Sequence, residues 1–121
     1  MAEKKEIKDL VIPEITPDEK ILQEGVVKSI MIYKRISPVV SLKYALTDRG
    51  IWTHHPGSFL AKPRSVFLAY DAVKYYEAYS HLGQDCCVFR PKDGKTFNGF
   101  LFEEDHQEVI QILDTYLTRK G

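Results

Sequence analysis

Hydrophobic and polar residues alternate along most of the chain, in short runs that turn residues separate. Such runs, rich in β-branched and aromatic residues, predict β-strands. We count six or seven of them, near residues 26–34, 39–47, 51–55, 65–70, 73–81, 85–90 and 96–102. The turn PKDGK, around Asp93 and Gly94, joins the last two runs. Short turns between successive runs favour an antiparallel sheet.

The run at residues 39–47 has the alternation of a strand that is buried on one face only. Its apolar face carries Leu42, Tyr44 and Leu46, and its other face carries Ser41, Lys43, Ala45 and Thr47. We therefore predict that the first face is dry and that the second is exposed to water.

The four residues TDRG connect this run to the next one. Asp48 and Arg49 suit the central positions of a type I turn, and Gly50 suits a following bulge position that requires a positive φ. A strand that begins at Ile51 is therefore predicted to pair with the preceding strand. The segment HPGSFLAKPR, residues 55–64, is predicted to be a loop.

After Glu103 the apolar residues recur at a helical spacing. They follow the pattern i, i+1, i+3, i+4, i+7 and i+8: Val109, Ile110, Ile112, Leu113, Tyr116 and Leu117. Asp105 and Glu108 form a capping box at the start of this helix. Arg119 and Lys120 suit its negative C-terminal end. Because burial of such a stripe contributes on the order of 10 kcal/mol, the helix is expected to dock on the strands.

The chain of 121 residues is long enough for one sizeable core, so a single domain is expected. Residues 1–15 are rich in charge and are predicted to form a flexible N-terminal arm, with the domain at residues 16–121. At the start of the domain, TPDEKIL predicts one or two turns of helix before Gly25. Thr16 can cap this helix, and Pro17 suits its first position.

Seventeen basic and seventeen acidic residues cancel, so the net charge is zero at pH 7. Without a strong positive field, nucleic acid is not an expected partner. The sequence has neither an apolar run of signal-peptide length at its start nor an apolar membrane span, and we expect a soluble, cytoplasmic protein. Cys86 and Cys87 are neighbours that would point to opposite faces of a strand, so reduced thiols are expected rather than an internal disulfide.

Candidate metal ligands and nucleophiles are scattered along the chain. His54 and His55 lie at the end of a predicted strand, where neighbouring side chains diverge, so they do not readily share one ion. The other candidates stand at no spacing typical of a metal site: His81, His106, Cys86 and Cys87. The sequence also lacks G-x-S-x-G and H-E-x-x-H motifs and a phosphate-binding loop. We therefore predict no enzymatic activity, no cofactor and no metal.

A series of antiparallel strands followed by one C-terminal helix is typical of a strongly bent sheet or a partly open barrel. In such a fold the helix covers one end of the sheet. Four segments of the chain carry a resemblance to a known fold: EKILQEGVV, YALTDRGIWT, SVFLAYDAVKYYE and FNGFLFEEDHQEVIQIL. In these segments the chain resembles the pleckstrin-homology-like (PH-like) superfold, particularly bacterial PH-like and GRAM-type domains. The resemblance covers about residues 17–119. It implies a mainly β fold, in which a bent antiparallel sheet or partly open barrel of six to seven strands is capped by one amphipathic C-terminal helix.

The resemblance also implies a scaffold or adaptor module without chemistry of its own. The favoured function is assembly through protein–protein contacts, with a protein partner or with other copies of the chain. The alternative is peripheral binding of membrane lipids, because some relatives bind phosphoinositide headgroups through basic residues of the first two strands and their loop. The corresponding residues here are Lys28, Lys34, Arg35 and Lys43. Tyr44 and Ala45 follow Lys43, so the spaced basic pattern of those relatives is absent.

The run at 73–81 carries tyrosines on both of its faces, so one of these faces is expected to contact a partner. Tyr75 and Tyr79 lie on one face, and Tyr76 lies on the other with Lys74. Tyrosine is enriched at protein interfaces, and a sheet edge can recruit a strand from a partner. The predicted outward anchor is Tyr76, and the neighbouring contact residues are Lys74, Tyr75 and Tyr79. For any single one of these rings, core filling ranks ahead of a contact with a partner.

Overall fold

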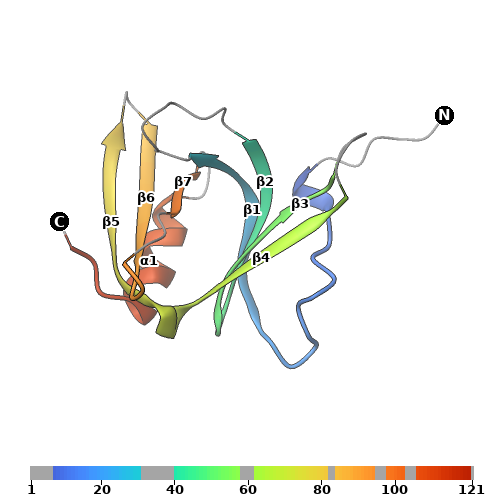
Figure 1. Cartoon of the computed structure of the whole chain (residues 1–121), viewed down its shortest axis with the longest axis horizontal. Coiled ribbons are helices and arrows are strands. Elements are labelled where there is room, and N and C mark those ends of the chain that lie inside the picture. Colours follow the sequence, from blue (N-terminus) through green and yellow to red (C-terminus); the bar gives the residue numbers. More distant parts are fainter. Residues whose placement is uncertain are drawn as a thin grey trace.

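Seven β-strands and one α-helix make up the computed structural model, which describes residues 7–30, 40–57, 62–81, 84–94, 98–102 and 106–120 (Figure 1). The strands are β1 (Ile21–Ile30), β2 (Val40–Thr47), β3 (Gly50–His55), β4 (Arg64–Ala69), β5 (Val73–His81), β6 (Gln84–Pro91) and β7 (Asn98–Phe102). Helix α1 (His106–Tyr116) follows them, and two short 3-10 turns are η1 (Ile7–Asp9) and η2 (Tyr70–Ala72). The predicted fold class, mainly β with a C-terminal helix, is confirmed.

The strands form one antiparallel sheet in the order β4-β3-β2-β1-β7-β6-β5. Neighbours in the sequence pair as hairpins, such as β2 with β3 and β5 with β6. β1 also pairs with β7, with Val27 opposite Phe102, and this pairing joins the two halves of the sheet. The sheet curls into a half-barrel with α1 at one end, which leaves β4 and β5 at its edges (Figure 1). The predicted bent sheet is therefore confirmed.

The core lies between the curled sheet and α1. Val109 and Leu113 of the helix are fully buried and belong to one hydrophobic cluster with side chains of the sheet. The closest pair of rings within this cluster of described residues joins β2 to β7, since the ring centroids of Tyr44 and Phe102 lie 4.9 Å apart. The prediction that the helix docks on the strands through its apolar stripe is confirmed. Asp105, the expected capping residue, lies outside the described residues.

Both faces of β2 are buried, so the prediction that one of them is exposed to water is wrong. Lys43, Ala45 and Thr47 on the expected wet face are at most 2% exposed. Residues 10–19, which we call the N-terminal cover, lie over this face and share a cavity of about 340 Å³ with Lys43 and Ala45. Ile12 of the cover is itself buried. The division of the chain into an arm and a domain at residue 15 stays a prediction.

The segment TPDEKIL forms a turn, so the helix predicted at its start is wrong. The Glu19 N–H donates to the Thr16 carbonyl at 3.1 Å, and β1 begins two residues later at Ile21. A helix of only one or two turns has little stability of its own, because its first turn is costly to form. Contacts of Glu19 with β2 and β3, described below, therefore determine the conformation of this segment.

Gly50 begins β3 without a positive φ, so the predicted left-handed bulge is wrong. Among the described glycines, φ is positive at Gly57 (86°) and at Gly94 (69°), and the second of these lies in the turn predicted at PKDGK. A side chain is excluded at Gly50 for a different reason. An added Cβ would lie 2.4 Å from the Leu68 carbonyl oxygen and 2.7 Å from a ring carbon of Phe67. Gly50 thus permits the close approach of β3 to β4.

The Gly50→Ala variant is expected to lose about 1 to 3 kcal/mol of stability, because the added methyl group forces β3 and β4 apart. Gly94→Ala is the control, since an added Cβ there meets no atom within 4 Å. Only backbone strain at its positive φ remains, which costs about 1 kcal/mol. Urea denaturation measures both changes. A Gly50→Ala variant as stable as the wild type would show that β4 does not approach β3 at this point.

Candidate functional site

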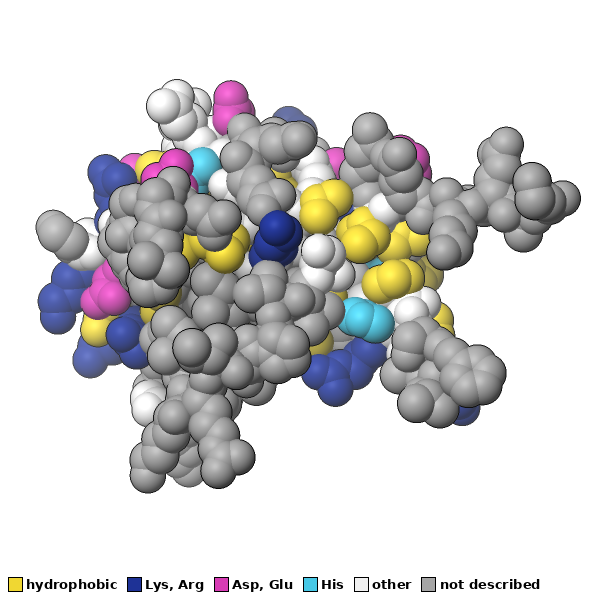
Figure 2. Space-filling model, turned by 90° about the horizontal axis from the view of Figure 1, so that it is seen from above, with side chains coloured by type: hydrophobic (Ala, Val, Ile, Leu, Met, Phe, Trp, Pro, Cys, Tyr) yellow, Lys and Arg dark blue, Asp and Glu magenta, His cyan; other side chains and the backbone are white. Residues whose placement is uncertain are grey.

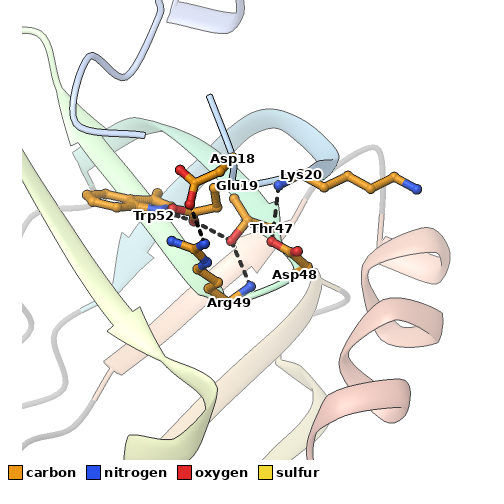
Figure 3. Close-up of polar contacts among 7 residues, drawn as sticks. All are labelled: Asp18, Glu19, Lys20, Thr47, Asp48, Arg49 and Trp52. Carbon is orange, nitrogen blue, oxygen red and sulfur yellow. Dashed lines mark hydrogen bonds and ion pairs between the residues drawn. The ribbon is translucent and has the colours of Figure 1, made fainter. Parts of the chain in front are cut away.

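The Glu19 carboxylate is buried where the N-terminal cover meets the turn between β2 and β3 (Figure 3). It accepts hydrogen bonds from the Thr47 hydroxyl at 2.5 Å and from the Trp52 indole N–H at 2.7 Å. The Thr47 oxygen in turn accepts from the backbone N–H groups of Arg49 and Gly50, at 3.1 and 3.2 Å. These polar groups already have partners within the chain, as buried polar groups generally do. Their arrangement stabilises the turn.

Further polar contacts surround this turn on its exposed side (Figure 3). The Lys20 N–H donates to the Asp48 carboxylate at 3.1 Å, and the Asp48 N–H donates to the Lys20 carbonyl at 3.0 Å. Asp18 pairs with the Arg49 guanidinium at 2.7 Å. A hydrogen bond from the Thr16 side chain, followed by that from Arg49, lowers the pKa of the Asp18 carboxyl to about 2. The cluster therefore fastens the N-terminal cover to the β2–β3 turn.

The two histidines that end β3 have separate partners. Nδ1 of the buried His54 ring lies 2.7 Å from the Ser65 hydroxyl oxygen. Ser65 donates its single proton to Glu14 at 2.6 Å, so it accepts from His54. Nδ1 of His55 accepts from the Gly57 N–H at 2.9 Å. Within the described ranges, no group of three or more His, Cys, Asp or Glu side chains could hold a metal ion.

Cys86, Cys87 and His106 are the remaining candidate nucleophiles and bases whose side chains the structure describes. Cys86 and Cys87 are both buried on β6. Burial raises the pKa of the Cys87 thiol to about 12 and also raises that of Cys86. A thiol with a raised pKa stays protonated near neutral pH and is a weak nucleophile. His106 is half-buried in the first turn of α1, and the His81 side chain lies outside the described residues.

Tyr76 of β5 is fully buried, so its predicted outward orientation is wrong. Its ring lies against Phe89, with centroids 5.9 Å apart, and its hydroxyl donates to the Asp114 carboxylate of α1. The cause is an irregularity in the pairing of β5 with β6 between Val73 and Tyr75, which interrupts the alternation of faces. Strict alternation would place Val73 and Tyr76 on opposite faces, but both belong to the core cluster.

The other residues predicted on β5 differ in their surroundings. Lys74 is exposed. Tyr75 is half-buried, and the Lys120 ammonium lies 4.9 Å from the centroid of its ring. The Tyr79 side chain lies outside the described residues. A role for Lys74, Tyr75 and Tyr79 in binding a partner stays a prediction.

The edge of β5 is occupied at Tyr76 by the chain's own C-terminal residues. The Tyr76 N–H donates to the Thr118 carbonyl at 3.0 Å, and the Lys120 N–H donates to the Tyr76 carbonyl at 2.9 Å. Tyr76 and Arg119 form a parallel β-bridge between these two bonds. The C-terminal residues thus take the backbone positions at which the sequence suggested a partner strand.

Lys43, predicted for lipid binding, does not present its charge to solvent. Its side chain is 3% exposed, and its ammonium lies 3.0 Å from the Glu24 carboxylate. The expectation that Lys43 is exposed is wrong, because the N-terminal cover buries this face of β2. Lys28 is half-buried, and Lys34 and Arg35 lie outside the described residues. No helix in the described part of the chain is long and apolar enough to cross a membrane.

The opposite edge of the sheet is β4, which pairs with β3 and with no further strand in the described ranges. We call residues 64–69 the β4 edge. Two of its hydrophobic side chains are exposed, Val66 at 47% and Phe67 at 39%. Because they are neighbours on a strand, they point to opposite faces of the sheet. Seen from above, hydrophobic side chains gather in the half of the molecule where β3, β4 and the N-terminal cover lie (Figure 2).

A groove of about 750 Å³ opens at the C-terminal end of the β4 edge. It lies between β4, η2 and the C-terminal end of α1. Its charge is mixed, since Asp48, Asp71 and Lys74 all line it. Tyr116 of α1 also lines the groove, and its ring stacks on Tyr70 with centroids 4.5 Å apart.

Local sequence patterns did not indicate the β4 edge as a candidate site. One signal was present, because Val66, Phe67 and Leu68 are three consecutive apolar residues. A strand with such a run places apolar groups on both of its faces, as strands covered on both sides do. Its position at the edge, however, depends on the order of strands in the sheet, which alternation within one strand does not reveal.

No protein-family model matches the chain, and no curated protein matches it. Among solved structures, the chain is similar to the hSac2 domain from the human phosphoinositide phosphatase Sac2, with a TM-score of 0.56 and 10% sequence identity. The match covers 88% of this chain and 81% of that chain. This likeness agrees with the architecture described above, a curled sheet with one C-terminal helix. The fold fits the PH-like superfold. At this identity the PH-like likeness concerns the fold alone, and the bacterial or GRAM type stays a prediction.

Proposed function

We propose that this PH-like domain is a non-enzymatic binding module that takes an extended protein segment onto the β4 edge. The observation that carries the proposal is an edge strand with exposed Val66 and Phe67 and with no second strand partner among the described residues. Such an edge offers a row of backbone N–H and C=O groups. When a peptide is added as a strand, these groups provide affinity and alternate side chains provide specificity.

Beyond Arg64, its first residue, the β4 edge lacks the features by which proteins usually protect an exposed strand. Prolines, charged side chains and β-bulges all hinder edge-to-edge pairing. From Ser65 to Ala69 the chain has no proline and no charged residue. β4 also pairs with β3 in continuous register, from Gly50 opposite Ala69 to His55 opposite Arg64. A regular strand of this kind is competent to pair with a further strand.

The other edge of the sheet supports the choice of β4. Residues 118–120 already lie on β5 and form two backbone hydrogen bonds with Tyr76. A partner strand at this point would have to displace them. The β4 edge needs no such displacement by the described residues.

The described reactive side chains favour binding over catalysis. The Cys87 thiol is buried with a raised pKa, and the Glu19 carboxylate accepts two hydrogen bonds from the chain itself. The His54 ring is buried against Ser65. A catalytic nucleophile or base needs access to a substrate and a pKa that suits its role near the working pH. None of these three groups combines the two properties.

The Val66→Lys variant is expected to bind extended peptides at least about tenfold more weakly than the wild type, on the order of 1.4 kcal/mol. The reason is that a lysine on an edge strand opposes strand addition. The probes are peptides selected from a random display library against the immobilised full chain. Ile21→Lys is the matched control, because Ile21 of β1 is 44% exposed and Val66 is 47% exposed. Fluorescence polarisation should give wild-type affinity for this control.

Equal peptide affinity of Val66→Lys and the wild type would remove the β4 edge from the proposed function. Thermal melts followed by circular dichroism establish that both variants are folded. Vesicles that contain phosphoinositides are the competing ligand, because the similar solved domain comes from a phosphoinositide phosphatase. Suppose that vesicles bind the wild type and Val66→Lys equally well at physiological salt, and that no peptide binds. This result would favour the lipid alternative.

A further inference from the structure

We infer that the cavity beneath the N-terminal cover binds a small molecule in which a short alkyl chain carries a primary ammonium group. The cavity has a volume of about 340 Å³ and lies between the cover and the outer face of β2. It is a second site, separate from the β4 edge, because no residue of 64–69 lines it. If each non-hydrogen atom takes about 30 Å³, the share of a water molecule in the liquid, about ten such atoms fit inside.

Most of the cavity wall is apolar. Leu10, Ile12 and Ile15 of the cover contribute to it, together with Ile21 of β1 and Ala45 of β2. Ile12 and Ala45 are buried, whereas Ile21 is 44% exposed, so the mouth of the cavity lies on the side of β1. Ligand pockets in proteins have this composition, an apolar wall with a few polar groups that fix the orientation of the ligand.

One polar group of the wall has a hydrogen-bonding position that the chain does not use. Glu19 lines the cavity and is 8% exposed. The hydrogen bonds from Thr47 and Trp52 both end on its Oε2 atom, and Oε1 accepts none from the described residues (Figure 3). Oε1 is not one of the sealed, unbonded side-chain atoms of the described ranges, so it is accessible. A buried carboxylate oxygen is stabilised by a further donor, which a ligand in the cavity is placed to supply.

The charge of the wall selects a cationic donor. Glu19 and Glu24 carry two negative charges and Lys43 carries one positive charge, so the described residues of the wall have one negative charge in excess. The Lys43 ammonium is already paired with Glu24 at 3.0 Å, and its side chain is 3% exposed. A ligand carboxylate would meet two like charges. A ligand ammonium group meets two opposite charges and donates a charge-assisted hydrogen bond to Oε1 of Glu19.

Three probes with the same six-carbon chain test this selectivity on the full chain: hexylamine, hexanol and hexanoate. NMR titration at neutral pH measures their affinities. Hexylamine is expected to bind at least about tenfold more tightly than either of the others. The chain has a single tryptophan, so the Trp52 indole N–H that donates to Glu19 gives one separate signal, which should shift on binding. Equal affinities for the three probes, or tighter binding of hexanoate, would overturn the inference.

Glu19→Gln tests the atom that the ammonium group contacts. The amide oxygen can accept both protein hydrogen bonds, because these end on one oxygen, and the amide NH₂ group then replaces Oε1. A donor thus takes the place of the acceptor, and hexylamine is expected to bind at least about tenfold more weakly. Glu108→Gln is the control, since it makes the same charge change at an exposed position of α1. A folded Glu19→Gln variant with wild-type affinity would overturn the inference.

A second variant serves if thermal melts show that Glu19→Gln does not fold. Glu24 is 51% exposed at its side chain, so Glu24→Gln removes one of the two negative charges with less effect on the fold. Hexylamine is then expected to bind about threefold more weakly, or worse, than it binds the wild type. An unchanged affinity of this variant, with Glu19→Gln unfolded, would overturn the inference.

The cavity and the β4 edge can be tested separately. Hexylamine should shift the amide signals of residues that line the cavity, such as Ile12 and Ala45, and leave residues 64–69 unchanged. Library peptides should bind the chain equally well with and without hexylamine. Shifts confined to residues 64–69, or no binding of any probe, would overturn this inference and leave the proposed function of the β4 edge to its own test with Val66→Lys.

Discussion

Tyr76→Ala is expected to lower the free energy of unfolding by about 3 to 5 kcal/mol, as removal of a large buried aromatic ring does. The Tyr76 ring is 0% exposed and lies against Phe89. Its truncation leaves a cavity between β5 and α1 and also removes the hydroxyl group that donates to Asp114. Urea denaturation monitored by circular dichroism measures the loss.

Two variants separate the contributions of this ring. Tyr76→Phe keeps the ring and loses only the hydrogen bond, so a loss of about 1 kcal/mol is expected. Tyr75→Ala removes a half-buried ring beside the Lys120 ammonium, and its expected loss is also about 1 kcal/mol or less. A Tyr76→Ala variant with an unchanged melting temperature would mean that the ring faces solvent, as the sequence suggested.

Leu113→Ala is expected to cost about 2 to 5 kcal/mol, because Leu113 is fully buried between α1 and the sheet. Gln111, two positions earlier, is exposed on the same helix. Gln111→Ala should therefore change the stability by less than about 0.5 kcal/mol. Both values come from urea denaturation of the full chain. If the two variants unfolded at the same urea concentration, α1 would not cover the core.

Features of the fold that depend on nearby residues were predictable from the sequence. The apolar stripe of α1 predicted that Val109 and Leu113 face the core, because a helix repeats its faces every three or four residues. The turn at Gly94 followed from turn residues that lie next to one another. The same local periodicity located the strands after β1 to within two residues at their ends. For β1 the predicted start is wrong, because the strand begins at Ile21, five residues before Val26.

Features that depend on distant residues were predicted wrongly. The outer face of β2 is buried by the N-terminal cover, so Lys43 pairs with Glu24 in place of facing water. Gly50 is required by the approach of Leu68 and not by its own φ. In both cases the decisive neighbour lies on another strand or segment, and local alternation carries no information about it.

The candidate site was harder to predict than the fold. A single irregularity between Val73 and Tyr75 was enough to move Tyr76 from the expected outer face into the core. Residues 118–120 then occupy the β5 edge at Tyr76, on the strand that the sequence had assigned to a partner. The β4 edge becomes a candidate only once the order of strands is known, because the sequence of β4 does not by itself show that the strand lies at an edge.

Amide hydrogen exchange along β4 tests the central claim most directly, because an added strand gives the outward N–H groups of β4 new hydrogen-bond partners. Residue-resolved NMR would compare the dilute full chain with the same chain saturated by a library peptide. The predicted result is slower exchange at alternate residues of 64–69, with β5 unchanged. Exchange that stays the same throughout β4 while the peptide is bound, or that slows only in β5, would contradict the role of the β4 edge.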